Sequence, residues 1–187
     1  MNWIILIILF LPLSIFAYAD FSYKFAQITH TTIDDDDFGD ATTIDLDVSF
    51  ETSENIFLSF GYGAGDFDDI DLDLDVLQFG VGYHAPISES ADFVSRVEYV
   101  EGETDGLLDS DLDGYGISVG VRAQLAEKVE VLVGVIYSDI DVESGGVSAS
   151  DSDTDLAANI ALNLTDSLQA VIDIDGDDQS LGLGLYF

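Results

Sequence analysis

The chain has no cysteine and very few bases, and both absences narrow its chemistry. Its 187 residues include 4 Lys and Arg against 38 Asp and Glu, which gives a net charge of −34. Without cysteine there is no disulfide, no thiolate metal site and no cysteine nucleophile. Nucleic acid is excluded as a partner, because phosphates need Lys and Arg to neutralise them. Apolar residues still make up 48% of the chain, which is not the composition of a disordered protein.

Long hydrophobic runs are also lacking after residue 19, so no transmembrane helix is expected there. Residues 3–16 form one short apolar stretch, and the small-x-small pattern Ala17-Tyr18-Ala19 follows it directly. We predict that residues 1–19 are a cleaved signal peptide and that residues 20–187 form the mature domain. The alternative is an uncleaved membrane helix, for which the apolar run is short.

Alternation with a period of two residues dominates the mature chain. From Tyr115 to Leu125, apolar residues alternate with Gly, Ser, Arg and Gln. A strand places two such sets on opposite faces of a sheet. Ten segments of this kind can be recognised: 21–31, 41–51, 55–65, 74–84, 91–101, 114–125, 129–139, 155–164, 168–175 and 179–187.

The connections between these segments alternate between short and long. This arrangement predicts a meander of antiparallel hairpins, with tight turns at one end and longer loops at the other. The fourth segment changes phase between Val76 and Leu77, which indicates a bulge or an entry from a loop. Four of the connections are long and acidic: 32–40, 66–73, 102–113 and 140–154.

Two architectures share this alternation. A soluble sheet protein buries the apolar face, whereas a transmembrane barrel turns it toward lipid. Segments of about 9–11 residues match a tilted bilayer span. The other face carries many glycines together with charged residues, which would be costly in a closed apolar core. Aromatic residues of the apolar face fall near the two strand ends, as in the girdles of membrane barrels: Phe21, Tyr23, Phe50, Tyr83, Phe93 and Phe187 at one end, and Tyr62, Tyr99, Tyr115 and Tyr137 at the other.

We therefore predict an all-β fold, a closed antiparallel up-and-down transmembrane β-barrel of about ten strands, with eight as the alternative count. The last strand must pair with the first, since an open edge cannot persist in hydrocarbon. Its apolar residues Leu181, Leu183, Leu185 and Phe187 would then face lipid.

The segments F-L-S-F-G-Y-G-A-G (57–65) and L-Q-F-G-V-G-Y-H-A-P-I (77–87), together with the terminal L-G-L-G-L-Y-F, resemble the small bacterial outer-membrane barrel superfamily. That superfamily includes OmpA-type and OmpX-type domains. The resemblance implies a location in the outer membrane of a Gram-negative bacterium, with outer-membrane lipid and lipopolysaccharide as surroundings. It also implies that the barrel assembly machinery reads the C-terminal residues as an assembly signal.

Charged residues on the inward face form the first candidate site. The bases Lys24, Arg96 and Arg122 and the acids Glu51, Glu98 and Glu130 are expected at similar heights in the lumen. In a narrow lumen each charge needs a partner, which predicts an internal salt-bridge network. The alternative is a gate or selectivity constriction, and with this net charge it would prefer cations.

A second candidate lies in the acidic stretch D-S-D-L-D-G. Asp109, Asp111 and Asp113 fall at positions 1, 3 and 5 of a calcium loop, but position 12 is Gly120 rather than Glu, so an EF-hand is excluded. We expect a solvated acidic loop and no cofactor, with a weak Ca²⁺ or Mg²⁺ site as the alternative. Catalysis is not expected, because His30 and His84 lack the Asp-His pattern of barrel proteases.

These features predict an outer-membrane barrel with acidic extracellular loops and a structural or surface-interaction role in the Gram-negative envelope, with cations or surface ligands as further partners. A narrow, cation-preferring, porin-like channel is the first alternative. A secreted, soluble, calcium-binding β-protein is the second.

Overall fold

A computed structural model describes five stretches of the chain: residues 22–33, 41–67, 72–106, 109–176 and 178–187. The predicted signal peptide, residues 1–19, lies outside the described residues, as do the acidic connections 34–40 and 68–71. No helix of the described residues is long and apolar enough to cross a membrane.

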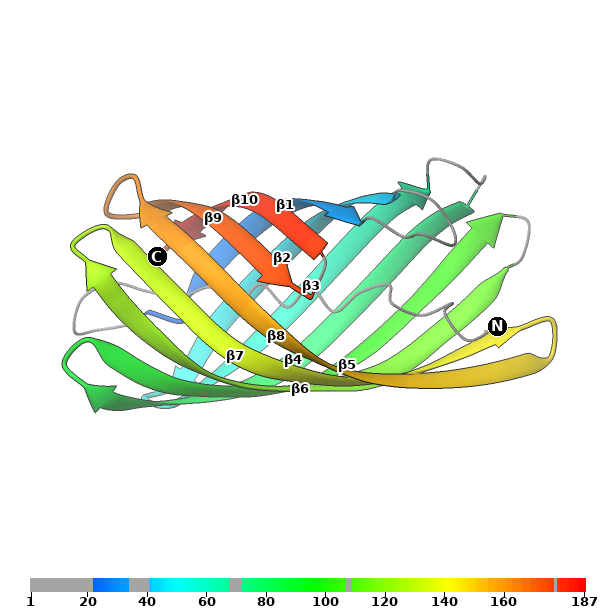
Figure 1. Cartoon of the computed structure of the whole chain (residues 1–187), viewed down its shortest axis with the longest axis horizontal. Coiled ribbons are helices and arrows are strands. Elements are labelled where there is room, and N and C mark those ends of the chain that lie inside the picture. The colour runs from blue at the N-terminus through cyan, green and yellow to red at the C-terminus, as the bar shows by residue number, and fades with distance from the viewer. Residues whose placement is uncertain (1–21, 34–40, 68–71, 107–108, 177) are drawn as a thin grey trace.

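Ten antiparallel strands close into a barrel in which each strand pairs with its neighbours along the chain (Figure 1). The prediction of ten strands is therefore confirmed, and the alternative of eight is wrong. The strands are β1 Phe25–Ile33, β2 Ala41–Ser53, β3 Ile56–Phe67, β4 Leu72–Ser88, β5 Ala91–Gly106, β6 Ser110–Ala126, β7 Val129–Ser144, β8 Val147–Asn163, β9 Leu168–Asp175 and β10 Asp178–Tyr186.

The last strand closes the barrel against the first. The register between β1 and β10 runs without interruption from the Phe25–Tyr186 pair to the Thr32–Gln179 pair. Backbone N–H and C=O groups find no water in hydrocarbon, so they must be satisfied by neighbouring strands. Pairing with β10 satisfies the backbone groups of β1 in this way.

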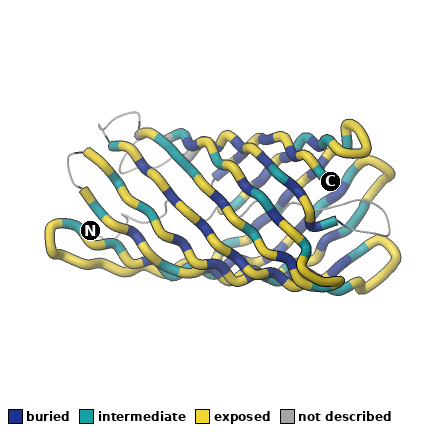
Figure 2. The backbone as a smooth tube through the Cα atoms, turned by 180° about the vertical axis from the view of Figure 1, so that it is seen from behind, coloured by how far each residue is buried: buried dark blue, intermediate teal, exposed yellow. Residues whose placement is uncertain are grey.

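Apolar side chains point outward and small or charged ones point inward. Along β6, Ile117 and Val119 are 42% and 45% exposed, whereas Ser118 and Arg122 are 2% and 0% exposed. Figure 2 shows this alternation of buried and exposed positions along most strands. A soluble β-protein would need the reverse orientation, so the transmembrane interpretation holds and the soluble one is wrong.

Several strands are longer than the sequence pattern indicated. β5 continues to Gly106 and β6 begins at Ser110, so both strands extend into the predicted loop 102–113. β7 and β8 are joined at a tight turn, where Gly145 and Gly146 have φ angles of +58° and +82°. The predictions of long loops at 102–113 and 140–154 are therefore wrong, because most of these residues form paired strands.

These strands depart from the sequence prediction because apolar residues change faces at the acidic end of the barrel. There Leu112 and Ile140 point inward and are 8% and 6% exposed, while Asp111 and Asp113 point outward. The same inversion places Leu74 and Val76 inside. The register between β3 and β4 is continuous through this region, so the bulge predicted between Val76 and Leu77 is wrong. Outward positions are apolar only where they would meet lipid.

Most of the predicted aromatic positions face outward at the two ends of the strands. Phe50, Tyr83 and Phe187 are 50%, 47% and 66% exposed at the short-turn end. Phe93 is exposed at that end as well, and Tyr62, Tyr99 and Tyr115 are exposed nearer the acidic end.

Two aromatic positions depart from this pattern, and a third lies outside the described residues. Tyr137 is only half-buried, and Phe21 lies outside the described residues. The outward assignment of Tyr23 is wrong, because its ring lies inside the barrel with 1% exposure. Tyr23 shares the inward face with Phe25 and Gln27, which are also buried.

Inward glycines provide room for large side chains of neighbouring strands. Gly82 on β4 lies against the ring of Phe57 on β3, and a Cβ at Gly82 would overlap that ring. Phe57 cannot easily move, because it is 4% exposed and stacks on Tyr23 with ring centroids 4.7 Å apart. Gly184 differs, since its nearest neighbour is the ring edge of Tyr186, 3.2 Å from a built Cβ.

We expect Gly82→Ala to destabilise the barrel by about 1–3 kcal/mol, the usual cost of overpacking a filled interior. The measurement is the urea midpoint of the folded band on a gel run without boiling. Gly184→Ala is the matched control and should change the midpoint little, because the Tyr186 side chain can shift. Equal midpoints for wild type and Gly82→Ala would show that Phe57 is not confined.

Candidate functional site in the barrel interior

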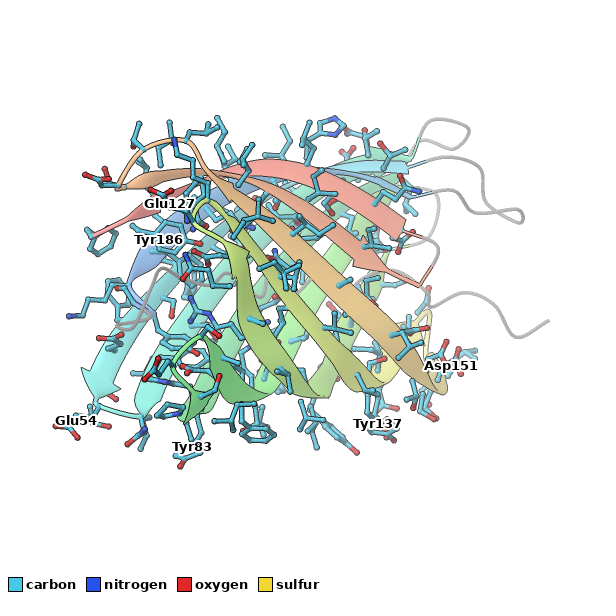
Figure 3. All side chains as sticks on the ribbon, turned by 60° about the vertical axis from the view of Figure 1, so that its left-hand side comes forward. Glu54, Tyr83, Glu127, Tyr137, Asp151 and Tyr186 are labelled. Carbon is cyan, nitrogen blue, oxygen red and sulfur yellow. The ribbon has the colours of Figure 1, made fainter. Side chains whose placement is uncertain are left out.

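The interior joins two chemically different ends. In Figure 3, Glu54, Tyr83, Glu127 and Tyr186 mark the short-turn end, and Asp151 marks the acidic end. Inward side chains occupy the space between the two ends, and their character changes along the barrel axis. The interior is therefore the place where a pore, a gate or a filled core can be distinguished.

An apolar cluster lines the interior of the longer strands near the acidic end. Val142, which is partly buried, packs against this cluster. Burial of such side chains stabilises the strand extensions in the same way as a soluble core does. The cluster is formed by seven buried residues of β4 to β8: Leu74, Val76, Val100, Leu112, Ile136, Ile140 and Ala157.

A polar wall lines the interior on β1, β2 and β8 to β10. The carboxylate of Asp45 accepts hydrogen bonds from Thr31 at 3.2 Å and Thr43 at 3.0 Å. Asn159 donates its amide hydrogen to Asp173 at 2.5 Å. Asp45 and Asp173 are interior acids that the sequence analysis did not identify. Their partners Thr31 and Asn159 lie on neighbouring strands, and a single sequence does not show which residues are opposite each other. Hydroxyl and amide donors thus compensate part of the cost of burying these carboxylates.

An ion pair lies at the middle of the interior. Arg96 Nε and Glu98 Oε1 are 3.0 Å apart, and both side chains are almost fully buried. Both residues belong to β5 and are two positions apart, so they point to the same face. Asp47 is also buried at this level, and its Oδ2 has no hydrogen-bond partner among the described residues.

Aromatic rings fill the interior at the short-turn end. The Tyr23 ring stacks on His84 with centroids 3.9 Å apart, and on Phe57 at 4.7 Å. Arg122 lies over the same ring, with its guanidinium carbon 4.6 Å from the centroid. Leu132 packs beside them and is fully buried. We call these five residues, Tyr23, Phe57, His84, Arg122 and Leu132, the aromatic plug.

Two further carboxylates hold the polar edge of the aromatic plug. Asp92 accepts a hydrogen bond from the Tyr23 hydroxyl at 3.4 Å, and its Oδ2 lies 3.4 Å from His84 Nδ1. Glu130 is fully buried and accepts a hydrogen bond from Asn163 at 2.8 Å. His84 and Asp92 come from neighbouring strands, and the register of β4 with β5 brings them together.

The six charges predicted as one lumen network are divided among three places. Arg96 and Glu98 pair in the middle. Arg122 and Glu130 lie at the short-turn end, where Arg122 contacts Tyr23. Lys24 and Glu51 pair at 3.5 Å, but the Lys24 side chain is 47% exposed and lies at the rim, before β1 begins. A role of these residues in gating stays a prediction.

The three acids proposed for a metal site lie along strand β6 rather than around a loop. Asp111 and Asp113 point outward from β6, and Asp109 directly precedes it. Their neighbours across the sheet are also acids, since Asp111 pairs with Glu103 and Glu143. In the described stretches, no three His, Asp or Glu side chains are grouped so that they could hold a metal ion.

The two histidines lie in different surroundings. His30 points outward from β1, between Ile44 and Leu181 of the adjacent strands. His84 pairs with Asp92, yet the stacked ring of Tyr23 covers it. The absence of catalytic activity stays a prediction.

The proposed assembly signal faces outward along β10. Leu181, Leu183, Leu185 and Phe187 are 64%, 50%, 55% and 66% exposed. Inward positions of this strand include Gly182 and Gly184, which are buried. An apolar outer face ending in an aromatic ring is thus present in the folded chain, and its recognition by assembly machinery stays a prediction.

Comparisons with known proteins agree with this architecture. No family model matches the chain, and no curated protein matches it. Among solved structures, an outer membrane channel from Pseudomonas putida F1 is similar with a TM-score of 0.57 and 11% identity, over 89% of this chain and 98% of that one. A structure named KdgM porin is similar with a TM-score of 0.50 and 10% identity, over 87% of this chain and 99% of that one.

The fold and its outward apolar face define a transmembrane β-barrel of the bacterial outer-membrane type. At such low identity the likeness shows the fold alone. The narrower resemblance to OmpA-type and OmpX-type domains stays a prediction.

We expect Glu98→Gln to destabilise the barrel strongly, by about 3–5 kcal/mol, because it leaves Arg96 as an unpaired buried charge. The double variant Arg96→Gln with Glu98→Gln should recover much of that loss. Urea midpoints of the wild type, both single variants and the double variant form the required cycle. Additive losses would contradict the pairing.

Proposed function

We propose that this chain is a bacterial outer-membrane barrel with a filled lumen, and that it acts at the cell surface through its acidic end rather than as an open pore. The aromatic plug carries the proposal, because Tyr23, Arg122 and Leu132 are 1%, 0% and 0% exposed. The rings of Tyr23, Phe57 and His84 stack on one another and occupy the interior at that level. The role is then structural or interaction-based.

The orientation of the barrel in the outer membrane follows from the distribution of its charges. Short turns and the rim base Lys24 are expected on the periplasmic side, and the acidic strand extensions outside the cell. Outward Tyr62 and Tyr115 would sit at the outer headgroups. Expected surroundings are outer-membrane lipid and lipopolysaccharide, and the barrel assembly machinery would read the face of β10 that ends in Phe187.

A narrow, cation-preferring channel is the second candidate, and one observation favours it. Asp47 Oδ2 and Glu98 Oε2 are buried without a hydrogen-bond partner among the described residues. A buried polar atom left unpaired costs about 1–3 kcal/mol, so water is expected at this level. A channel would then require the aromatic plug to move, with Asp47 and Glu98 attracting cations above it.

Conductance in planar bilayers separates these two candidates. We expect the wild type to show no steady single-channel steps, and Tyr23→Ala combined with Phe57→Ala to show cation-selective steps, because the aromatic plug is then removed. Tyr83→Ala is the matched control, since Tyr83 lies at the same end but points toward lipid. Steady cation-selective conductance of the wild type would favour the channel and overturn the filled lumen.

Weak binding of Ca²⁺ or Mg²⁺ at the acidic end is a further proposal. Asp111 lies opposite Glu103 and Glu143, and like charges placed directly opposite destabilise a sheet. A divalent cation would relieve this repulsion without a built coordination site. The acidic end would otherwise remain a solvated surface without a cofactor.

We expect millimolar calcium to raise the temperature at which the folded band disappears on a gel, and Asp111→Asn with Asp113→Asn to reduce that rise. The physical reason is relief of repulsion between outward carboxylates. Sodium chloride at equal ionic strength controls for general screening. If calcium and sodium act equally, specific binding is absent.

A further inference from the structure

Strand β8 has a free edge outside the barrel wall. Its residues 147–155 pair with β7 on one side, whereas β9 pairs with β8 only from Ala157 onward. Among the described residues, no strand lies against the other side of this stretch. At about 3.3 Å per residue the free edge is about 30 Å long. Figure 1 shows the β7–β8 hairpin projecting beyond its neighbours.

The direction of the backbone groups on this edge can be established from one hydrogen bond and the alternation of the strand. Gly176 N–H donates to the Leu156 carbonyl at 3.4 Å, so the backbone of Leu156 faces the β9 side. Because this direction alternates along a strand, Ser148, Ser150, Ser152 and Thr154 face the same side. Their N–H and C=O groups therefore form the free edge.

Two of these edge donors are covered by carboxylates of the same strand. Asp151 Oδ1 accepts a hydrogen bond from Ser152 N–H at 3.0 Å, and Asp153 Oδ1 accepts one from Thr154 N–H at 2.6 Å. Both carboxylates are exposed, so the caps are surface contacts that a competing donor can displace. The stretch has no Pro, Lys or bulge, which are the usual permanent protections of an edge.

The charges of the edge decide which strand can pair with it. Asp151 and Asp153 lie on one face, and the hydroxyls of Ser150 and Ser152 lie on the other. A second copy of this chain would bring its own carboxylates against these, and repulsion would oppose pairing. A strand with Lys or Arg at alternate positions would instead attract the carboxylates away from the edge N–H groups.

We propose that the free edge of β8 is a docking site for an extended, cationic polypeptide segment of a partner protein. The segment adds as a strand: its backbone takes over the hydrogen bonds of the even-numbered residues, while its basic side chains pair with Asp151 and Asp153. Backbone bonds give affinity and the alternating charges give specificity. This inference deepens the proposed surface role. Its test does not depend on conductance, so either proposal can fail separately.

The probe is a labelled peptide of about eight residues in which Lys and Thr alternate, a length that matches the edge. It is titrated against the folded full chain in zwitterionic detergent and followed by fluorescence anisotropy. A peptide of the same composition with its lysines in one block is the control, because its charges cannot match the strand period. We expect the alternating peptide to bind about tenfold more tightly or better.

Ser152→Pro combined with Thr154→Pro tests the edge itself. Proline removes two edge N–H donors without changing the charge, and it leaves the side bonded to β7 intact. We expect binding of the alternating peptide to weaken about tenfold or more. If the double variant does not fold, Ser150→Pro alone serves the same purpose. Asp111→Asn with Asp113→Asn is the matched control for charge, and it should keep the preference for the alternating peptide.

Three outcomes would overturn the proposal. Equal binding of both peptides would mean that the net charge alone attracts them. Unchanged binding by the folded proline variants would place the peptide elsewhere. A wild-type dimer that the proline substitutions abolish would make a second copy of the chain the occupant.

Discussion

Backbone hydrogen bonding in hydrocarbon is the constraint on which the rest of this structure depends. Every N–H and C=O inside the bilayer must be paired, so the sheet must close through β1 and β10. Closure in turn creates a narrow interior in which an unpaired charge is costly. The pairing of Arg96 with Glu98, and the contact of Arg122 with Tyr23, follow from that confinement.

The same constraint ends where the bilayer ends, and the strands change character at that level. Above the outward tyrosines, acids such as Asp113 face out, whereas Leu112 and Ile140 face in. Strands there are stabilised by water outside and apolar packing inside, as in a soluble sheet. An open edge is also tolerated in water, which is why the part of β8 before Leu156 can pair with β7 alone.

The alternating pattern was sufficient to predict a closed ten-stranded barrel with its apolar face toward lipid, because period-two patterns report side-chain direction directly. It failed where the solvent outside the barrel changes, and so Val76 suggested a bulge that is absent. It also did not predict that the residues of the aromatic plug contact one another. Tyr23, His84 and Asp92 come from three strands, and their contact depends on register and on glycines such as Gly82, which a single sequence does not specify.

The acidic residues of the outer end affect association with other chains through their positions as well as through their net charge. Where strands are paired, opposing carboxylates such as Asp111 and Glu143 repel each other across the sheet, and the apolar interior must offset that cost. On the free edge the carboxylates serve differently, because Asp151 and Asp153 satisfy backbone donors that water would otherwise hydrate. Repulsion between like edges then disfavours pairing of this chain with itself. The barrel has no open edge in lipid because its sheet closes. Its remaining edge lies in water, where the carboxylates repel an acidic strand and attract a basic one.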